Sequence, residues 1–286
     1  MPSLIDIRRR VRSVRNTQQI TKAMKMISAA KLRRAQDRAL AARPYGSMLR
    51  QILANVAEAA SQNPDAAGHP LLAVRPEKKV LLLVVTADRG LAGAFNTNLL
   101  KLAQRFVNEN GVKELQVEAI GRKARDYFRK RSVTLTGEYL DMMRQLSVAY
   151  ADKIAESVID RFSKGEVDAV YLFVNEFKSV IAPHLTQTRL LPIEVPASSA
   201  PVDYIYEQKP EQLLGSLLPK YVKSQIYRAL LESVAAEHAA RMTAMDAASS
   251  NASEMIDSLT LYMNRVRQAS ITREIIEIVS GAAALD

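Results

Sequence analysis

The side chains best suited to chemistry are scattered along this 286-residue chain instead of being grouped. There is no cysteine, which excludes disulfides, thiolate metal ligands and thiol nucleophiles. The three histidines, His69, His184 and His238, stand far apart, without an H-E-x-x-H pair or a carboxylate cluster at metal-ligand spacing. The G-x-S-x-G signature of serine hydrolases is also missing. We therefore expect no catalytic residue, no metal ion and no cofactor in this chain.

One glycine-rich turn offers an alternative. Residues 86–96 (TADRGLAGAFN) follow an apolar run and precede a helical pattern, which is where backbone amides can bind a phosphate. The turn does not read G-x-G-x-x-G, however, and the chain has no G-x-x-x-x-G-K-[ST]. Asn96 or Thr97 would also serve as an ordinary helix cap. The pattern favours a structural or partner-docking turn, with a nucleotide site as the minor alternative.

Basic charge is concentrated at the start of the chain. Residues 1–50 hold 13 Lys and Arg against 2 Asp and Glu, and the whole chain holds 40 against 30, so the remainder is nearly neutral. Such a segment attracts nucleic acid, an anionic membrane surface or an acidic protein loop. It lacks aromatic residues for base stacking up to residue 44, and Ile, Met and Ala alternate with the cations. This pattern favours docking on an acidic protein.

Two stretches without glycine or proline, residues 3–43 and 220–280, predict long helices at the two ends of the chain. Each has an apolar stripe with spacings of three and four, and each stripe shifts its register once. We expect the helices to pair as an antiparallel coiled coil, with an ordinary helical bundle as the alternative. The stripes are Leu4, Ile7, Val11, Val14, Ile20, Met24 and Ile27, and Ile256, Leu259, Met263, Val266, Ile271, Ile275 and Ile278.

The middle of the chain alternates between strand and helix patterns. Residues 79–86 form a continuous apolar run typical of a strand buried on both faces. Such alternation predicts a Rossmann-like, mostly parallel α/β domain. Further strands are expected at 115–120, 132–135, 168–174 and 186–193, with helices at 95–108, 121–130 and 142–162 and a linker at 62–76. We thus predict an N-terminal coiled-coil helix (1–60), an α/β foot domain (77–205) and a C-terminal coiled-coil helix (208–286).

Several motifs in order along the whole chain resemble the gamma subunits of F-type ATP synthases. They are residues 15–26 (RNTQQITKAMKM), 29–34 (AAKLRR), 87–93 (ADRGLAG) with Asn96, 264–272 (NRVRQASIT) and 278–282 (IVSGA). The middle motif usually begins with serine and has cysteine where Ala92 stands here. The redox-regulatory cysteine insert of chloroplast relatives is absent, so the resemblance is to the bacterial type.

The resemblance implies a central rotor shaft that couples proton-driven rotation of the membrane c-ring to ATP synthesis, or to the reverse hydrolysis, in catalytic beta subunits. It implies a non-catalytic subunit, with one copy per complex. Its partners would be the alpha and beta subunits of the catalytic hexamer, the epsilon subunit and the c-ring. It would bind no nucleic acid and would reach the membrane only through the complex, at the cytoplasmic face of the bacterial inner membrane.

The resemblance also suggests roles for particular residues. The expected contacts with the beta subunit are Arg8, Arg9, Arg12, Met24 and Lys25. The expected coupling or head contacts are Glu237, Arg241, Arg267, Gln268 and Thr272, and the expected contacts with the c-ring or epsilon are Tyr206 and Glu207. Two simpler alternatives stay open, in which Met24 is a core residue of the coiled coil and Glu237 pairs with Arg241 within one helix.

Two other classes of function remain as hypotheses. The basic N-terminal helix would let the chain bind DNA, with an affinity that falls steeply with salt. The turn after Thr86 would let it act as an α/β enzyme with an unfamiliar site. Neither explains the nearly neutral C-terminal helix that carries residues 264–272.

Overall fold

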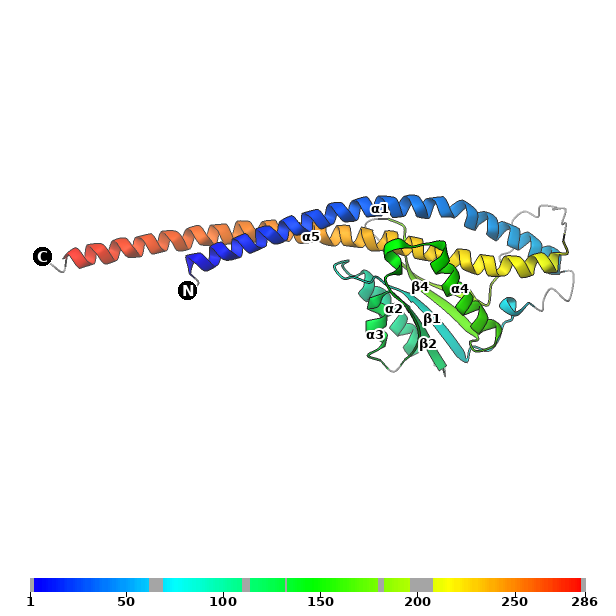
Figure 1. The fold of residues 1–286 in the computed structure, drawn as a ribbon. Helices are drawn as coiled ribbons and strands as arrows, with labels where there is room; N and C mark the ends of the chain where they lie inside the picture. Colours follow the sequence, from blue (N-terminus) through cyan, green and yellow to red (C-terminus); the bar gives the residue numbers. More distant parts are fainter. Residues whose placement is uncertain are drawn as a thin grey trace. The chain divides into compact units, whose positions relative to one another are not determined.

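The computed structural model describes residues 3–61, 69–109, 114–131, 133–179, 183–195 and 208–283. Long helices stand at both ends of the chain, α1 (Leu4–Ser61) and α5 (Pro210–Ala283) (Figure 1). Both exceed the stretches without glycine and proline, since α1 continues through Pro44 and α5 includes Pro219. An internal proline costs about 3 kcal/mol in an isolated helix. Buried residues beyond each proline, such as Leu53 and Val222, supply the packing that offsets this cost.

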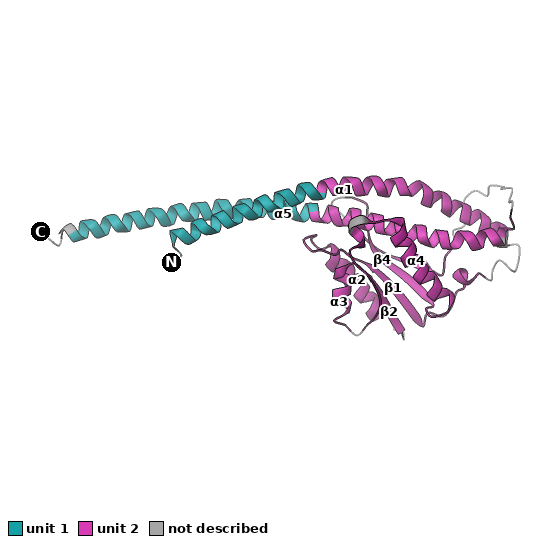
Figure 2. Cartoon of the chain, viewed as in Figure 1, with its two compact units in different colours: residues 1–28, 242–286 teal, residues 29–241 magenta. Residues whose placement is uncertain are grey.

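The chain divides into two compact units, residues 1–28 with 242–286 and residues 29–241 (Figure 2). The first unit is a pair of antiparallel helices. Thr21 of α1 contacts Ser249 of α5, and Lys25, one turn later in α1, contacts Asp246, one turn earlier in α5. The expected antiparallel pairing of the terminal helices is therefore confirmed within this unit.

The buried seam of α1 differs from the expected apolar stripe. Ile20 and Ile27 are 60% and 56% exposed, whereas Thr21 and Ser28 are buried. The seven-residue spacing that starts at Ile7 continues without a register shift and places Thr21 and Ser28 on the buried side. The expectation was wrong because it followed apolar residues only, and this seam is built partly from small polar ones.

The stripe of α5 is confirmed only in part. Ile256, Leu259, Met263 and Val266 are half-buried, but Ile271, Ile275 and Ile278 are exposed. In the register set by Thr21 and Ser249, the first residue of α1, Leu4, lies opposite Val266. Within the first unit α5 therefore extends beyond α1, and its last turns have no helix beside them to cover the apolar side chains.

The second unit contains a five-stranded sheet with strand order β3-β2-β1-β4-β5. Its strands are β1 (Lys79–Val85), β2 (Glu114–Ile120), β3 (Thr134–Tyr139), β4 (Ala169–Phe177) and β5 (Pro183–Leu191). The first four are parallel, and β5 pairs antiparallel with β4. The mostly parallel α/β domain is thus confirmed, with β3 ending four residues later than expected.

Helices cover both faces of this sheet. Alternate residues of β1 point to opposite faces, so that Leu81 and Leu83 meet α4 (Val148–Ser163), α1 and α5. Val80 and Leu82 meet α2 (Phe95–Glu109) and α3 (Arg122–Phe128). The helix expected at 142–162 is interrupted, because the extended backbone of Ser147 separates the 3-10 helix η3 (Met142–Gln145) from α4. The expected linker contains the short 3-10 helix η2 (Pro70–Leu72).

Candidate functional site: contact surfaces and a buried joint

The first group of expected contact residues lies on α1 in the first unit. Arg8, Arg9 and Arg12 are exposed, and none of them forms an ion pair within the described part of the chain. Three unneutralised cations within two helical turns form a surface that is complementary to acidic groups. We call Arg8, Arg9 and Arg12 the basic face.

Unlike the residues of the basic face, Lys25 forms an ion pair within the chain and Met24 is half-buried. Lys25 donates to Asp246 at 2.6 Å, and both side chains remain about half exposed. Such a surface pair contributes about 0.2–1 kcal/mol and is weakened by salt. Met24 is half-buried, so its side chain both borders the seam and reaches solvent. This half-burial fits both a contact residue at the surface and a residue at the border of the coiled-coil core.

The second expected group is divided between the two units. Arg267, Gln268 and Thr272 are exposed on α5 in the first unit, within the part that extends beyond α1. The same turns expose Ile271, Ile275, Ile276, Ile278 and Val279. Contiguous exposed apolar side chains rimmed by polar ones are typical of a protein interaction surface. We call residues 267–281 the exposed end of α5.

Glu237 and Arg241 belong to the second unit, where Glu237 is buried and Arg241 is partly buried. Their side chains are 11% and 12% exposed, and Arg241 Nη1 lies 2.7 Å from Glu237 Oε1. The intrahelical pair is therefore confirmed. Arg241 Nη2 also donates to the carbonyl oxygen of Gly90 at 3.3 Å. Burial raises the pKa of Glu237, while the guanidinium of Arg241 opposes this rise.

Hydrogen bonds within the chain hold the glycine-rich turn that precedes α2. The amide of Ala87 donates to Asn96 Oδ1 at 2.9 Å, and Asp88 Oδ1 accepts from the amide of Arg122. The hydroxyl of Thr86 accepts from the amide of Ala124 at 2.8 Å. Asn96 therefore binds the turn that precedes it and does not cap its own helix, contrary to expectation. This arrangement supports the reading of a structural turn.

A buried carboxylate in the sheet was missed by the sequence reasoning. Glu118 of β2 is 1% exposed, and Arg161 Nη1 lies 2.9 Å from its Oε1. The hydroxyl of Tyr139 donates to the other carboxylate oxygen, and burial raises the pKa of this tyrosine to about 12. Burial also raises the pKa of Glu118, against the effect of Arg161. The available signal was a glutamate inside an otherwise apolar strand end (VEAI).

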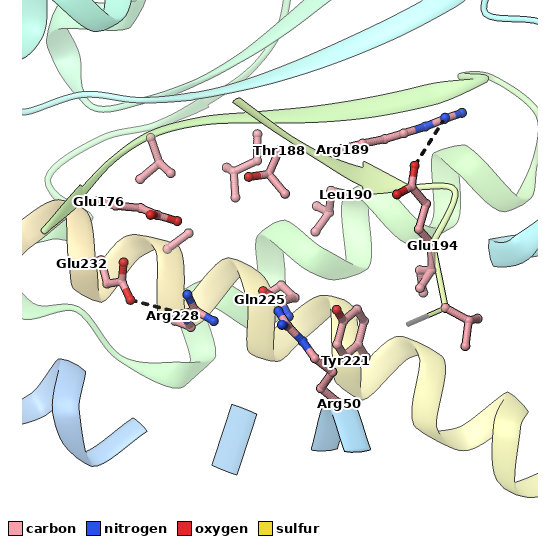
Figure 3. Close-up of a pocket in the computed structure, with 15 residues that line it drawn as sticks. Arg50, Glu176, Thr188, Arg189, Leu190, Glu194, Tyr221, Gln225, Arg228 and Glu232 are labelled. Atoms are coloured by element: carbon pink, nitrogen blue, oxygen red, sulfur yellow. Dashed lines mark hydrogen bonds and ion pairs between the residues drawn. The ribbon is translucent and has the colours of Figure 1, made fainter. Parts of the chain in front are cut away.

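A cavity of about 380 Å³ lies between β4, β5 and α5, with Arg50 of α1 at its edge (Figure 3). Charges of both signs line it, and two pairs neutralise each other, Arg228 with Glu232 at 3.2 Å and Arg189 with Glu194 at 3.8 Å. Its lining therefore has no clear preference for an anion or a cation.

The described ranges contain no group of three histidine, aspartate or glutamate side chains close enough to hold a metal ion. No helix among them combines the length and the apolar content that crossing a membrane requires. Tyr206 and Glu207, the expected contacts with the c-ring or epsilon, lie outside the described residues.

Comparison with known proteins covers the whole chain. A family model described as ATP synthase matches residues 3–285. The ATP synthase gamma chain of Solibacter usitatus is 62% identical over 286 residues, covering all of both chains. That of Pelotomaculum thermopropionicum is 49% identical over 289 residues, again covering both chains completely.

Solved structures agree at the level of the fold. A chain of the Euglena gracilis mitochondrial ATP synthase rotor has a TM-score of 0.65 at 18% identity, covering 94% of this chain and 98% of its own. A chain from the central stalk and c-ring of the Tetrahymena thermophila enzyme has a TM-score of 0.63 at 24% identity, covering 80% and 99%. Since the family model and the curated relatives match from end to end, this chain belongs to the ATP synthase gamma chain family.

Proposed function

We propose that this chain is the central shaft of an F-type ATP synthase, where it couples rotation of the c-ring to ATP synthesis or hydrolysis in the beta subunits. Membership of the gamma chain family supports this role. The structural observation that carries it is the exposed end of α5, which continues past α1 with uncovered isoleucines. A helix end of this composition needs an apolar enclosure, and a ring of partner subunits supplies one. The chain itself is a non-catalytic subunit.

The proposed partners are the alpha and beta subunits of the hexamer, the epsilon subunit and the c-ring, with one shaft in each complex. Similarity to bacterial gamma chains and to chains of a solved ATP synthase rotor and a solved central stalk supports these partners. The complex would place the chain at the cytoplasmic face of the bacterial inner membrane. We also propose the division into helices 1–60 and 208–286 and a foot domain, 77–205.

The proposed contact residues are those that the family resemblance suggests, and the exposure and charge of several of them support the proposal. The basic face would meet acidic loops of beta, and Met24 and Lys25 would do so from about three turns further along the same helix. Arg267, Gln268 and Thr272 would donate or accept hydrogen bonds inside the head. Tyr206 and Glu207 would meet the c-ring or epsilon, a proposal that rests on the family resemblance alone.

Coupling would work through unequal contacts. The surface of two unlike helices is asymmetric, so at any angle it touches the catalytic subunits differently. A contact that is stronger with one conformer of a subunit shifts the population toward that conformer. Turning the shaft would then carry each catalytic subunit through the same conformers in sequence, while the chemistry stays in those subunits.

Reconstitution tests this proposal. The purified chain is mixed with alpha and beta subunits from the same source, and complex mass and MgATP hydrolysis are measured together. We expect a complex of one chain with the hexamer, and hydrolysis that depends on adding the chain. Absence of a complex, with alpha and beta folded, would contradict the proposal.

Substitution of the basic face tests whether these three cations promote assembly. Changing Arg8, Arg9 and Arg12 to Gln should slow assembly and reduce its salt dependence, because unpaired exposed cations steer association. The matched control changes three exposed basic residues of the second unit, Lys101, Lys123 and Lys130, to Gln. Equal effects of the two triple variants would show that only net charge matters.

A further inference from the structure

The glycine-rich turn rests directly on α5 within the second unit. Ala87, Ala92 and Phe95 are buried against Ala236, with Ala240 one turn further along the same helix. Small side chains on both sides let the turn and the helix approach closely. This contact is separate from the larger apolar core in which Leu218, Val222 and Ile226 of α5 face the sheet.

Polar groups fix the position of the turn on α5, which the apolar contact alone does not determine. Apolar packing is non-directional, whereas a planar guanidinium with two partners has one geometry. Arg241 supplies this geometry, since one nitrogen meets Glu237 at 2.7 Å and the other donates to the Gly90 carbonyl at 3.3 Å. Asp88 of the turn and Lys31 of α1 lie close enough to influence Glu237 electrostatically.

The residue after Gly90 shows that the turn is held firmly. Leu91 has a φ of 62°, a left-handed conformation that carries an energetic cost for a leucine. Its side chain is 63% exposed, so its own packing does not compensate for this cost. Such a conformation persists where the surrounding contacts determine it. The anchored neighbours are Gly90, bound to Arg241, and Ala92, buried against α5.

We infer that Arg241 and Glu237 are positioning residues that lock the 86–93 turn onto α5, forming a joint through which torque passes between the α/β domain and the shaft helix. This inference rests on the proposed function, and it changes the role expected for these two residues. Their side chains are engaged within the chain, so they act on coupling through the turn and not by touching the hexamer.

A local probe of the turn tests the joint directly. The chain lacks cysteine, so Leu91→Cys introduces one thiol into it, which is spin-labelled before the chain is assembled with the other subunits. Arg241→Ala and Arg241→Lys should both increase the mobility of this label, because lysine keeps the charge but loses the two-partner geometry. The matched control is Arg228→Ala, which breaks another Arg–Glu pair of α5, with Glu232, without touching the turn. This control should leave the label unchanged.

Coupling is measured in the same set of variants in the membrane-bound enzyme, as protons pumped for each ATP hydrolysed. We expect Arg241→Ala and Arg241→Lys to lower this ratio and Arg228→Ala to retain the wild-type value. If Leu91→Cys itself impairs the enzyme, the rate of trypsin cleavage at Arg89 in the cysteine-free chain replaces the label. Faster cleavage in the Arg241 variants would then report the released turn.

Each result has a definite meaning. Unchanged label mobility in the Arg241 variants would overturn the joint. A mobile turn with unchanged coupling would also overturn it, because the turn would then lie outside the path of torque. If the unsubstituted chain fails to assemble with alpha and beta, the proposed function fails instead, whatever the variants do.

Discussion

The hydroxyl oxygens of Ser249 and Thr21 lie 2.7 Å apart, inside the seam between α1 and α5 of the first unit, and the Ser249 hydroxyl also lies 2.8 Å from the carbonyl oxygen of Met245. Thr21 donates its own proton to the carbonyl of Gln18, which leaves its oxygen free to accept. Both side chains are buried. A buried polar pair at one point of an otherwise apolar or small-residue seam specifies which residues face each other.

Loss of this hydrogen bond should be measurable. Ser249→Ala should lower the free energy of unfolding by about 0.5–1.5 kcal/mol, the usual net contribution of one intramolecular hydrogen bond. Ser253→Ala, one turn along α5 at an exposed position, is the control and should change little. Urea unfolding of the full chain measures both. Equal effects would show that the seam does not depend on the pair.

The Lys25–Asp246 pair should behave as a surface interaction. A double-mutant cycle with Lys25→Met and Asp246→Asn should give a coupling energy of about 0.2–1 kcal/mol at low salt. In 1 M salt the Debye length shrinks to about 3 Å, and the coupling should largely disappear. The reversed pair, Lys25→Glu with Asp246→Lys, should restore it. A coupling energy that is insensitive to salt would disagree with the exposure of the two side chains.

Removing one partner of the buried Arg161–Glu118 pair should destabilise the fold far more than removing one partner of an exposed pair. Arg161→Met leaves Glu118 without its cation and should cost about 3–5 kcal/mol, whereas Arg129→Met, which breaks an exposed pair with Glu138, should cost under about 1 kcal/mol. Burial raises the pKa of Glu118, and removal of Arg161 removes the opposing influence. A raised carboxyl pKa stabilises the fold at low pH and loses this effect as pH rises through the folded pKa.

The Arg161→Met variant should therefore be least stable at neutral pH and should partly recover on acidification. Thermal unfolding midpoints of the variant and of the unsubstituted chain, compared at pH 7 and pH 5, measure this difference. A variant that loses the same stability at both pH values would argue that lost packing of Arg161, and not the stranded charge, causes the defect.

The lowered pKa of His238 predicts that the stability of the fold changes with pH in the opposite direction. Burial, aided by Arg241 and Lys31, lowers the pKa of His238 to about 4 from 6.5. Between these values the unfolded chain binds more protons, so this group reduces stability as pH falls from about 6.5 toward 4. His238→Gln removes the effect, and its unfolding midpoint should fall less between pH 7 and pH 5 than that of the unsubstituted chain. Parallel midpoints would mean that His238 titrates normally.

Glu237, the neighbour of His238, acts in the other direction because burial raises its pKa. Its contribution to stability is present at low pH and decreases as pH rises through the folded value. The comparison must therefore be made between the His238 variant and the unsubstituted chain, since the total pH profile mixes the two groups.

The parts of the fold that the sequence predicts well are those set by strong local patterns. The apolar run of β1 and the alternation of strand and helix patterns predict the sheet. The stretches without glycine and proline at the two ends of the chain predict the long helices. The stretches without glycine and proline are shorter than α1 and α5, because packing of residues such as Leu53 outweighs the preference of Pro44 and Gly46 to interrupt a helix.

The candidate sites were harder to predict because they depend on what faces a side chain across the fold. The sequence alone does not identify Thr21 as a seam residue, because its place in the seam depends on Ser249, which lies opposite it. The role of Arg241 likewise depends on the Gly90 carbonyl, which lies beside it only in the folded chain. The basic face, by contrast, needs no partner within the chain, and its exposure agrees with the charge count of the first 50 residues.

A rotation assay tests most directly whether this chain turns inside the catalytic hexamer. Lys101→Cys on α2 introduces a single thiol at an exposed position of the cysteine-free chain, to which a bead is attached after the hexamer is fixed to a surface. With MgATP, we predict rotation in one direction, with a pause for each catalytic subunit. A complex that hydrolyses MgATP while the attached bead stays still would contradict the account.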